Sequence, residues 1–341
     1  MQEKRIAILA IQETHLSEAR VNLLNSQFNR RLKIWNSADP TNPNGGKGIA
    51  IILNKQLTSW KEAVIKHIIL GRALLMSLPW HRNSIVNVFT IYTPNIAQEN
   101  AEFWTSLIDK WMEENLLLPN IVLGDFNVVE EAIDHLPAHR DSAQAVSRLA
   151  SFKVLHTLQD RWRNNNLTEQ FFTFTQEATQ SRSCIDQIYV SNPVYKNSQN
   201  WSIDHTPIHI DHCLVSMEFA NPGAPFIGRG QWSIPLYLIK NRKAIQIAEK
   251  LGAQLEKEIE ASTGDSHTRG KSPQTAYHTF KKLLMREIRD FAKVNTPKMD
   301  AQIGNLKKDL CTVLNSTQES LEEIQVKAAY IEEKIRQLEA L

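Results

Sequence analysis

Polar residues with acid, base or metal-binding chemistry recur where the short apolar runs of this sequence begin or end. The set is Glu13, Asp125, Asn127, Asp186, Asp211 and His212. Residues i and i+2 of a strand point to the same side, so we expect Asp125 and Asn127 to share one cleft while Phe126 faces the core. Ligand sites in α/β proteins are usually built at strand ends, which makes these residues the candidates for a functional site.

A set of oxygen ligands with one histidine favours particular chemistry. Carboxylates suit Mg²⁺ or Mn²⁺, hard cations that keep some of their waters, whereas Zn²⁺ normally takes more His or Cys. A cation, a carboxylate base and a histidine together suggest phosphoester hydrolysis, with the histidine facing the developing negative charge. A simpler explanation stays open for each residue, because Asp at a strand end is more often a turn or helix cap. A second Asp-His pair, Asp204-His205, lies just before Asp211-His212, so such a pair alone carries little weight.

Alternating strands and helices are predicted over residues 1–220. The strand candidates are the apolar runs 6–11, 49–53, 73–78, 85–92, 121–124, 185–191 and 213–219. Helix candidates cover 98–113, where Phe103, Leu107 and Trp111 recur every four positions, and 142–152. Apolar runs without alternation are typical of strands buried on both faces. This pattern predicts an α/β domain whose sheets are covered by helices.

The sequence changes character after residue 220. Residues 221–235 are rich in Pro and Gly and are predicted to be a linker. Residues 236–341 are predicted to be helical, with candidate helices at 237–260 and 275–293 and a candidate coiled coil at 303–341. The coiled-coil seam is formed by Leu321, Ile324, Ala328, Ile331, Ile335 and Leu338. A helix that packs on its own domain, or on a neighbouring protein, explains this seam equally well.

Composition excludes several classes of protein. The 341 residues are 42% hydrophobic with a formal net charge of +2, which is not the composition of a disordered, highly charged chain. The three cysteines show no disulfide or Cys-x-x-Cys metal spacing, so we expect a reducing compartment. The longest apolar runs are far shorter than the ~18 residues that a membrane span requires. We therefore expect an intracellular protein with no membrane partner.

Six short motifs occur in a fixed order along residues 1–220. They are Ile11-Gln-Glu-Thr-His-Leu16, Asn44-Gly-Gly-Lys-Gly48, Ile91-Tyr-Thr-Pro-Asn95, Leu123-Gly-Asp-Phe-Asn127, Ser183-Cys-Ile-Asp-Gln-Ile-Tyr-Val-Ser191 and Asp211-His-Cys-Leu-Val-Ser216. Together they resemble the endonuclease/exonuclease/phosphatase superfamily with its DNase I-like fold. The closest likeness is to the apurinic-type endonuclease domain of non-LTR (LINE-type) retrotransposon proteins. The resemblance implies a four-layer sandwich over 1–220, with two packed, mainly antiparallel sheets flanked by helices, followed by an α-helical C-terminal extension.

The resemblance also implies roles for the metal and water ligands. Glu13 would bind Mg²⁺, or Mn²⁺, with help from Asp211. Asp125 would orient or deprotonate the attacking water. Asn127 would hold the scissile phosphate. Members of the family cut one DNA strand and leave a 3′-hydroxyl, which in retroelements primes reverse transcription, so the implied function is a DNA endonuclease that nicks.

Further roles follow from the same motifs. His212 would stabilise charge on the phosphorane-like transition state, and Asp186 would orient its imidazole. Tyr92 would contact the phosphate, and Asn95 would brace its loop. The likeness also selects Asp211-His212 over the other Asp-His pair, because the functional pair directly precedes the last strand.

Charge gives little support for DNA binding. Acidic and basic residues almost cancel over residues 1–230, whereas a duplex-binding domain usually has a basic footprint. Most basic residues are expected to be solvated surface. Lys47, in its Gly-rich loop, and Arg182, near the Asp186 motif, are the two predicted substrate contacts.

Two features of the sequence leave the function open. Family members begin with a strand that ends in a catalytic Asn, and we expect this domain to lack that strand, because Met1 falls near the start of the second one. The segment 226–235 resembles the connector to a downstream reverse transcriptase, so a polymerase module, or self-association through the C-terminal helices, is an expected interaction. The alternatives are a catalytically inactive truncated remnant with a protein-binding helical tail, and a phosphatase acting on small or lipid phosphates. Activity on DNA would require access to the nucleus.

Overall fold

The computed structural model describes residues 1, 5–43, 45–81, 84–206, 210–220, 232–261, 272–316 and 318–339. Asn44 of the Gly-rich motif and residues 221–231 of the predicted linker lie outside the described residues. The chain forms two compact units, one of Met1–Pro225 with Leu310–Arg336 and one of Phe226–Asp309 with Gln337–Leu341.

A six-stranded sheet is the centre of the first unit. Its strands, in spatial order, are β4 (Val64–Ile69), β5 (Ala73–Pro79), β6 (Ile85–Tyr92), β7 (Ile121–Asp125), β12 (Asp186–Ser191) and β9 (Leu158–Asp160). Neighbouring strands are antiparallel except for β6 and β7, which are parallel. The parallel pair brings the carboxyl ends of β6 and β7 to the same edge, where their polar residues meet.

A second layer of strands packs against this sheet. It consists of β1 (Ile8–Gln12), β3 (Ile49–Asn54) and β2 (Leu32–Ser37), in the order β1-β3-β2, and of the separate pair β13 (Ser198–Asp204) and β14 (Leu214–Phe219). Within the described residues, β1 is therefore an edge strand. A small third sheet joins β10 (Phe174–Thr175), β11 (Arg182–Ser183) and β8 (His135–Leu136).

The burial of β3 shows why its sequence is almost continuously apolar. Ile49, Ile51 and Leu53 pack into the core between the two strand layers. Ala50 and Ile52 point to the other side, where helix α1 (Glu18–Gln27) covers them. A strand covered on both faces has no solvent side, so the alternation of apolar and polar residues is lost.

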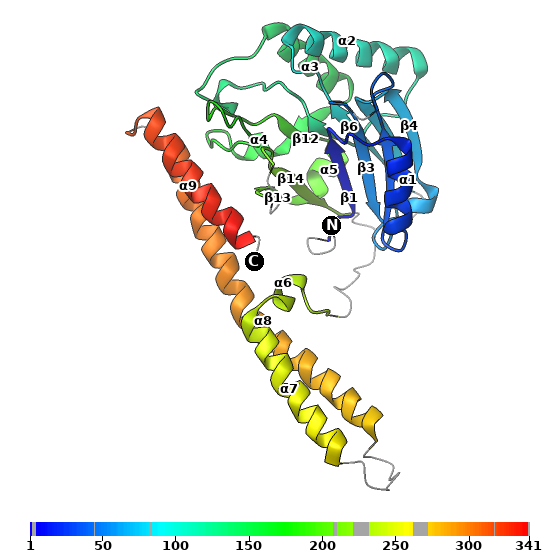
Figure 1. The fold of residues 1–341 in the computed structure, drawn as a ribbon. Coiled ribbons are helices and arrows are strands. Elements are labelled where there is room, and N and C mark those ends of the chain that lie inside the picture. The colour runs from blue at the N-terminus through cyan, green and yellow to red at the C-terminus, as the bar shows by residue number, and fades with distance from the viewer. Residues whose placement is uncertain are drawn as a thin grey trace. The chain divides into compact units, whose positions relative to one another are not determined.

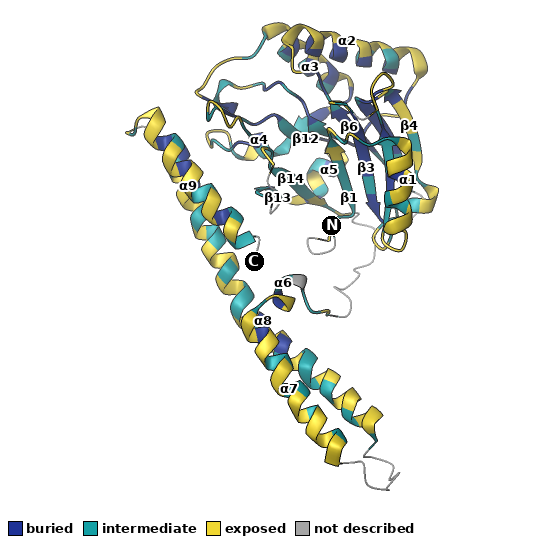
Figure 2. Ribbon diagram, viewed as in Figure 1, coloured by how far each residue is buried: buried dark blue, intermediate teal, exposed yellow. Residues whose placement is uncertain are grey.

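Two helices cover the outer face of the six-stranded sheet. They are α2 (Ala97–Glu114) and α3 (Ala143–Leu155), and Trp104, Leu107 and Phe152 from them are at most 1% exposed in the core beneath. The layers are thus α2 and α3, the six-stranded sheet, the β1-β3-β2 layer, and α1 (Figure 1). This arrangement confirms the predicted α/β four-layer sandwich. Buried residues are concentrated in the strands, and the outer helix surfaces are exposed (Figure 2).

The remaining elements complete the first unit. They are the short helices η1 (Trp60–Glu62), η3 (Ala132–Asp134), α4 (Arg161–Asn165) and α5 (Asn192–Asn197). Each predicted apolar strand is present. The short strands β8, β9, β10 and β11 were not expected, nor were β2, β4 and β13, because polar residues such as Lys33 and His67 interrupt their apolar pattern. No helix of the described residues is both long enough and apolar enough to span a membrane.

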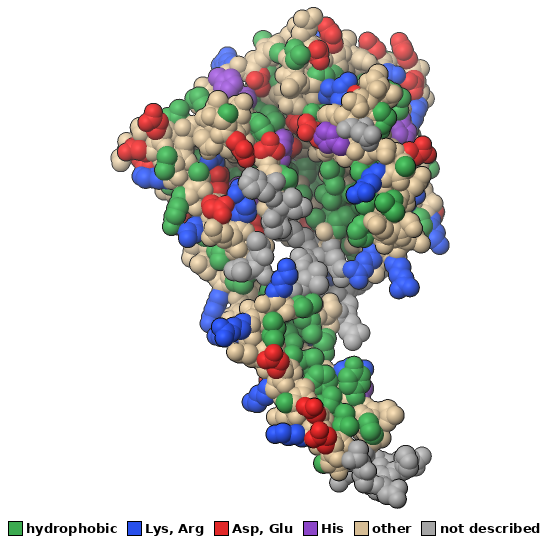
Figure 3. All heavy atoms as spheres, viewed as in Figure 1, with side chains coloured by type: hydrophobic (Ala, Val, Ile, Leu, Met, Phe, Trp, Pro, Cys, Tyr) green, Lys and Arg blue, Asp and Glu red, His purple; other side chains and the backbone are tan. Residues whose placement is uncertain are grey.

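The C-terminal region is helical, as the sequence predicts. It contains α6 (Leu236–Ile239), α7 (Arg242–Ala261), α8 (Pro273–Leu314) and α9 (Leu321–Glu339). In the second unit, Leu238 and Ala244 pack against Ile288 and Ala292 of α8. Figure 3 shows hydrophobic side chains gathered along the helices of this unit.

Helix α9 belongs largely to the first unit. The seam residues Ile324, Ala328 and Ile335 are at most 6% exposed, so other parts of this chain already cover them. The contacts of α9 with the sandwich include an ion pair between Glu332 and Arg182 of β11. The structure thus matches a helix that packs on its own domain, while the coiled coil and its self-association stay predictions.

Candidate functional site

Three predicted site residues lie side by side at the ends of adjacent central strands. Tyr92 of β6 is the register partner of Asp125 of β7, and Asp125 is the register partner of Asp186 of β12. Residues in register on neighbouring strands point to the same face of the sheet. The apolar runs of the sequence therefore do bring these side chains together.

Gly124 allows this close packing of strand ends. Its φ is +143°, and a Cβ atom at this position would lie 2.0 Å from the carbonyl oxygen of Ile91 on β6. Such a distance is far inside van der Waals contact, so Gly is the residue that fits here. The Gly-Asp-Phe-Asn sequence thus combines a glycine that permits the parallel pairing with the polar residues that follow it.

Asp125 is a buried carboxyl group held by its own turn. It is 6% exposed, and its Oδ1 accepts a hydrogen bond from the backbone N–H of Asn127 at 2.9 Å. Burial, reinforced by the neighbouring carboxylates of Asp186 and Glu13, raises the pKa of Asp125 to about 7. A carboxyl group with a pKa near neutrality is suited to act as a general base.

Asn127 lies beside Asp125 with its amide group already engaged. Its Nδ2 donates to Asp125 Oδ2 and to the carbonyl oxygen of Thr93, both at 3.0 Å. Its backbone adopts a left-handed conformation with φ of 45°, which Asn tolerates better than most residues. The structure thus gives Asn127 a positioning role for Asp125, and its predicted contact with phosphate stays a prediction.

His212 is held in its cationic form by Asp186. Its Nδ1 lies 2.8 Å from Asp186 Oδ2. Burial alone would lower the pKa of His212, but the hydrogen bond and the charge of Asp186, with further carboxylates nearby, outweigh burial and raise the pKa to about 9. The ring of Phe174 packs against the imidazole, with centroids 4.9 Å apart. The imidazole is thus positively charged at neutral pH and fixed in orientation.

Tyr92 connects this group to Glu13, which follows β1. The Tyr92 hydroxyl donates a hydrogen bond to Glu13 Oε1. Burial and the Glu13 carboxylate raise the pKa of Tyr92, so the phenol stays protonated. Arg72, which sequence reasoning missed, has its guanidinium 4.9 Å from the centre of the Tyr92 ring and its Nη1 3.0 Å from the Tyr92 carbonyl oxygen. Arg72 is the basic residue that the structure adds to this edge.

The carboxylates predicted to hold a cation lie at the exposed side of the site. Glu13 and Asp211 are both exposed, and the backbone of Asp211 is fixed by a hydrogen bond from Thr175 N at 3.1 Å. Glu13, Asp211 and Asp125 are not among the trios of ligand atoms that lie within 4.8 Å of one another in the described residues. Mg²⁺ is usually bound by one or two carboxylates while waters and substrate phosphate complete its shell, so it does not require a closer cluster. After burial, the charges of Asp186 and Glu13 also raise the pKa of Asp125, and a cation beside these carboxylates would be stabilised by them.

Asn100 is a second residue that sequence reasoning missed. It is 1% exposed on α2, and its Nδ2 donates to Thr93 Oγ1, Pro94 O and Phe126 O at 2.9 to 3.0 Å. Its Oδ1 accepts from Trp104 Nε1 at 2.8 Å. Asn100 therefore ties the loop after β6 to the loop after β7. A polar residue on the apolar face of a predicted helix was the signal that could have found it.

Comparison with known proteins places this fold in a family. The model of the Endonuclease/Exonuclease/phosphatase family matches residues 1–208. The chain belongs to this family. Membership supports a nuclease-type phosphodiesterase, and it confirms the resemblance drawn from the sequence motifs.

Individual relatives agree with this family assignment. The chain is 33% identical over 143 residues to the Transposon TX1 uncharacterized 149 kDa protein of Xenopus laevis, a match that covers 39% of this chain and 10% of that protein. Among solved structures, it is similar to the AP endonuclease LMAP from Leishmania major, with a TM-score of 0.53, 16% identity, and coverage of 65% of this chain and 80% of that one. It is also similar to an AP endonuclease from Archaeoglobus fulgidus, with a TM-score of 0.51, 18% identity, and coverage of 64% and 90%. These structural likenesses show the fold.

Two of the residues predicted to contact substrate, Asn95 and Lys47, lie at the surface. Asn95 is exposed in the turn before α2. Lys47 is half-exposed and lies 3.3 Å from Asp39 Oδ2. The hydrogen bonds from Thr41, with smaller contributions from Lys47, lower the pKa of Asp39 to about 2, so its carboxylate stays ionised beside Lys47. Both Asn95 and Lys47 remain accessible to a substrate.

The prediction that Arg182 contacts substrate is corrected by the structure. The Arg182 residue is 1% exposed, and its Nη1 is paired with Glu332 of α9. A guanidinium covered by a helix cannot reach a phosphate while that helix is in place. The sequence could not show this, because the pair joins residues 150 positions apart.

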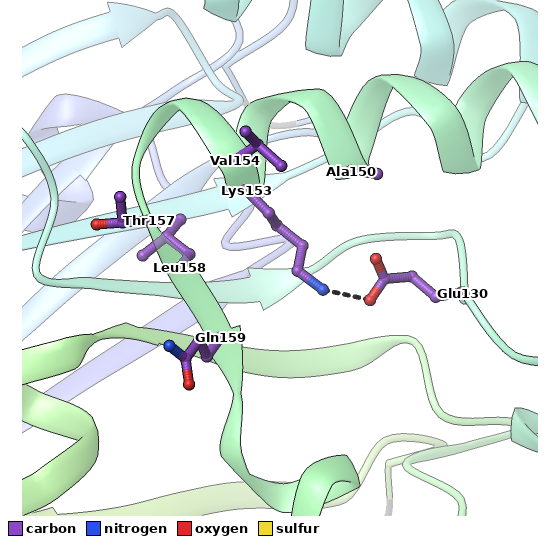
Figure 4. A pocket seen from close by; sticks show the side chains of 7 residues that line it. All are labelled: Glu130, Ala150, Lys153, Val154, Thr157, Leu158 and Gln159. Carbon is purple, nitrogen blue, oxygen red and sulfur yellow. Dashed lines mark hydrogen bonds and ion pairs between the residues drawn. The ribbon is translucent and has the colours of Figure 1, made fainter.

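Other polar groups of the family domain were not among the predicted site residues. Asp204 ends β13 and His205 follows it, with His205 Nδ1 3.5 Å from the Sγ of Cys213, the residue after His212. A shallow hollow is formed by Glu130, Ala150, Lys153, Val154, Thr157, Leu158 and Gln159 at the end of α3. Its Lys153 points to Glu130 and forms an ion pair with it (Figure 4). The hollow contains none of the predicted site residues.

Proposed function

We propose that this chain is a Mg²⁺-dependent DNA endonuclease that nicks one strand, leaves a 3′-hydroxyl and derives from a non-LTR retrotransposon. The observation that carries the proposal is the strand-end group in which Asp125 and the Asp186–His212 pair lie together. It joins a carboxyl group whose pKa is about 7 to an imidazole whose pKa is about 9. Between these values the first is ionised and the second is cationic, as general-base hydrolysis of a phosphodiester requires.

Each residue has one task in this mechanism. Asp125, oriented by Asn127, accepts a proton from the water that attacks phosphorus. The His212 imidazolium, fixed by Asp186, donates a hydrogen bond to the phosphate oxygens as negative charge grows on them. The bond from phosphorus to the 3′ oxygen breaks, and the departing oxygen takes up a proton from solvent water to become the 3′-hydroxyl. A bound Mg²⁺, with Glu13 and Asp211 as its protein ligands, would neutralise phosphate charge.

The similar proteins named above support DNA as the substrate. The two structural relatives are AP endonucleases, and the sequence relative is a transposon protein. Basic side chains do not form one stripe on the face drawn in Figure 3, where Lys and Arg are scattered among acidic residues. Phosphate contacts would therefore come from few residues, such as Arg72, which contacts Tyr92, and Lys47 of the Gly-rich loop. Association of the helical region with a reverse transcriptase module, and a nuclear location, remain predictions.

The test is nicking of supercoiled plasmid by the full chain with Mg²⁺, compared with Asp125→Asn and His212→Gln. Each variant should lose at least ~10²-fold in rate, because one removes the base and the other the charge stabiliser. The control is His278→Gln, which changes an exposed histidine of α8 and should nick as the wild type does. Extension of the nicked plasmid by a DNA polymerase, without phosphatase treatment, reports the 3′-hydroxyl.

Each outcome separates the competing explanations. A folded wild-type chain that does not nick DNA would support the inactive remnant with a protein-binding tail. Equal nicking by the wild type and by both site variants would point to a contaminating nuclease and overturn the proposal. Nicks that a polymerase cannot extend would leave the hydrolase but remove the 3′-hydroxyl product.

A further inference from the structure

A second group of ligand side chains lies outside the site described above. His135, His139 and Asp141 each offer one ligand atom, and these three atoms lie within 4.8 Å of one another. The residues follow the Gly-Asp-Phe-Asn loop, with His135 on β8 and the other two in the segment before α3. We propose that they form a Zn²⁺ site that fixes this segment to the sandwich.

The position of His135 Nε2 is the first argument. The side chain is 7% exposed, and Nε2 forms an ion-pair contact of 3.2 Å with Asp141 Oδ2 whose angles are not those of a hydrogen bond. Two ligands of one tetrahedral Zn²⁺, at ~2.1 Å from the metal, are about 3.4 Å apart and point at the metal instead of at each other. A buried nitrogen that faces a carboxylate oxygen at this distance, without a hydrogen bond, matches that arrangement.

The second argument is that the outer contacts leave the ligand atoms available. His139 Nδ1 lies 2.9 Å from the carbonyl oxygen of Pro137, which can only accept, so Nδ1 carries the proton and Nε2 the lone pair. His135 Nδ1 lies 2.9 Å from Ser183 Oγ. Asp141 Oδ2 accepts from Val129 N at 2.7 Å. Metal-binding histidines almost always use their second ring nitrogen in such bonds, which fix the tautomer and the ring orientation.

The choice of metal follows from the ligands. Two imidazoles and one carboxylate suit Zn²⁺ better than Mg²⁺, which prefers oxygen ligands. Three protein ligands leave a fourth position for water. The rings of His135 and His139 are stacked with centroids 3.8 Å apart, so His139 must turn, and exchange its present contact with the Pro137 carbonyl for another, before both lone pairs converge. His139 is exposed and can turn without disturbing the core.

The place of the cluster in the fold indicates a structural role. His135 is the register partner of Ser183 on β11, which leads into Asp186 of the candidate active site. The backbone N–H that orients Asp141 belongs to Val129, two residues after Asn127. A cation here would therefore link the segment that follows Asn127 to strand β11, which precedes Asp186.

The test is Zn²⁺ binding by the full chain after treatment with a chelator. Titration of Zn²⁺ against a fluorescent chelator, in excess Mg²⁺ to occupy the exposed carboxylates, should give one equivalent bound. His139→Ala should weaken binding by at least ~100-fold, and Ser183→Ala by ~10-fold through the loss of an outer contact. His278→Ala, which removes an exposed histidine of α8, and Asp211→Asn, at the proposed Mg²⁺ position, should bind as the wild type does.

A thermal-unfolding scan and a Co²⁺ spectrum complete the test. Zn²⁺ should raise the Tm of the wild type and of Asp211→Asn, but not that of His139→Ala, because a ligand that binds only the folded state stabilises it. Co²⁺ in place of Zn²⁺ should give the visible absorption of a tetrahedral site. Absence of stoichiometric Zn²⁺ binding, or equal binding by the wild type and His139→Ala, would overturn the proposal. None of these readouts depends on nuclease activity.

Discussion

The pair Asp186–His212 makes a quantitative prediction about the pH dependence of the reaction. Replacing Asp186 by Asn removes the carboxylate that raises the pKa of His212 to about 9. Burial, which lowers the pKa of this imidazole, then acts with less opposition, so the pKa should fall toward or below the ordinary 6.5. The pKa of Asp125 should fall as well, because the charge of Asp186 is one of the causes that raise it.

The sign follows from the two protonation states that the reaction needs. Asp125 must be ionised, which occurs above a pKa of about 7, and His212 must be cationic, which occurs below a pKa of about 9, so the wild type should be most active between these values. Near pH 8 the cationic fraction of His212 is about nine-tenths in the wild type and about one-thirtieth if its pKa falls to 6.5. Asp186→Asn should thus lose about 30-fold in rate near pH 8 and much less near pH 6, and its optimum should move toward acid.

The assay is plasmid nicking across pH in one mixed buffer, together with an NMR titration of the His212 ring. The control is Asp109→Asn, which removes one negative charge from an exposed position on α2. Its pH profile and its His212 titration should match the wild type. Because NMR detects the imidazole directly, the predicted fall in pKa can be tested even if the chain does not cut DNA.

Two results would refute the reasoning. If the rate of Asp186→Asn is reduced by the same factor at every pH, Asp186 does not set the protonation of His212 and acts by position alone. If the NMR titration of His212 is unchanged in the variant, the hydrogen bond between Nδ1 and Asp186 is not what holds the proton.

Two further predictions concern stability and are measured by urea unfolding. Asn100→Leu should destabilise the fold by at least about 3 kcal/mol, because it leaves buried acceptors of two loops and the Trp104 N–H without partners, whereas Gln98→Leu on the exposed face of α2 should change it by less than about 0.5 kcal/mol. Equal effects would show that Asn100 is not a structural tie. Glu332→Gln should cost about 3–5 kcal/mol, because it leaves the buried Arg182 charge unpaired, and Glu333→Gln, whose partner Arg336 is at the surface, should cost less than about 1 kcal/mol. A small effect of Glu332→Gln would mean that α9 is not held by this pair.

The members of the strand-end group could be predicted from the sequence because each lies at one end of an apolar run. The apolar runs before Asp125 and after His212 have the composition of buried strands, and a strand fixes which side its last residues face. The order of motifs then indicated the family, and the family fold matches the structure. The gathering of Tyr92, Asp125 and Asp186 follows from strand register, which no short window of sequence contains.

The parts that were missed depend on contacts between distant segments. Arg182 has the sequence context of a surface residue, and its burial comes from α9 at the far end of the chain. Arg72 reaches the site through a hydrogen bond to another strand, and Asn100 through two loops that the helix itself does not specify. Long-range pairing of this kind is set by tertiary structure. The cluster of His135, His139 and Asp141 is the exception, because its three residues lie within seven positions of one another and its signal is local.

The edge position of β1 affects which part of the candidate site loses its structure first. Asp125 and Asp186 lie on interior strands of the six-stranded sheet, and we expect the amides of these strands to exchange with solvent only when the whole domain unfolds. Glu13 follows the edge strand β1, and Asp211 lies in an exposed bend, so both can separate from the sheet through small local openings. Asp125 and Asp186 should therefore keep their positions until the fold itself unfolds. Glu13 and Asp211, which would hold the cation, should lose theirs under milder conditions. Gentle heating or dilute urea should therefore abolish cation binding at this site well before the domain unfolds.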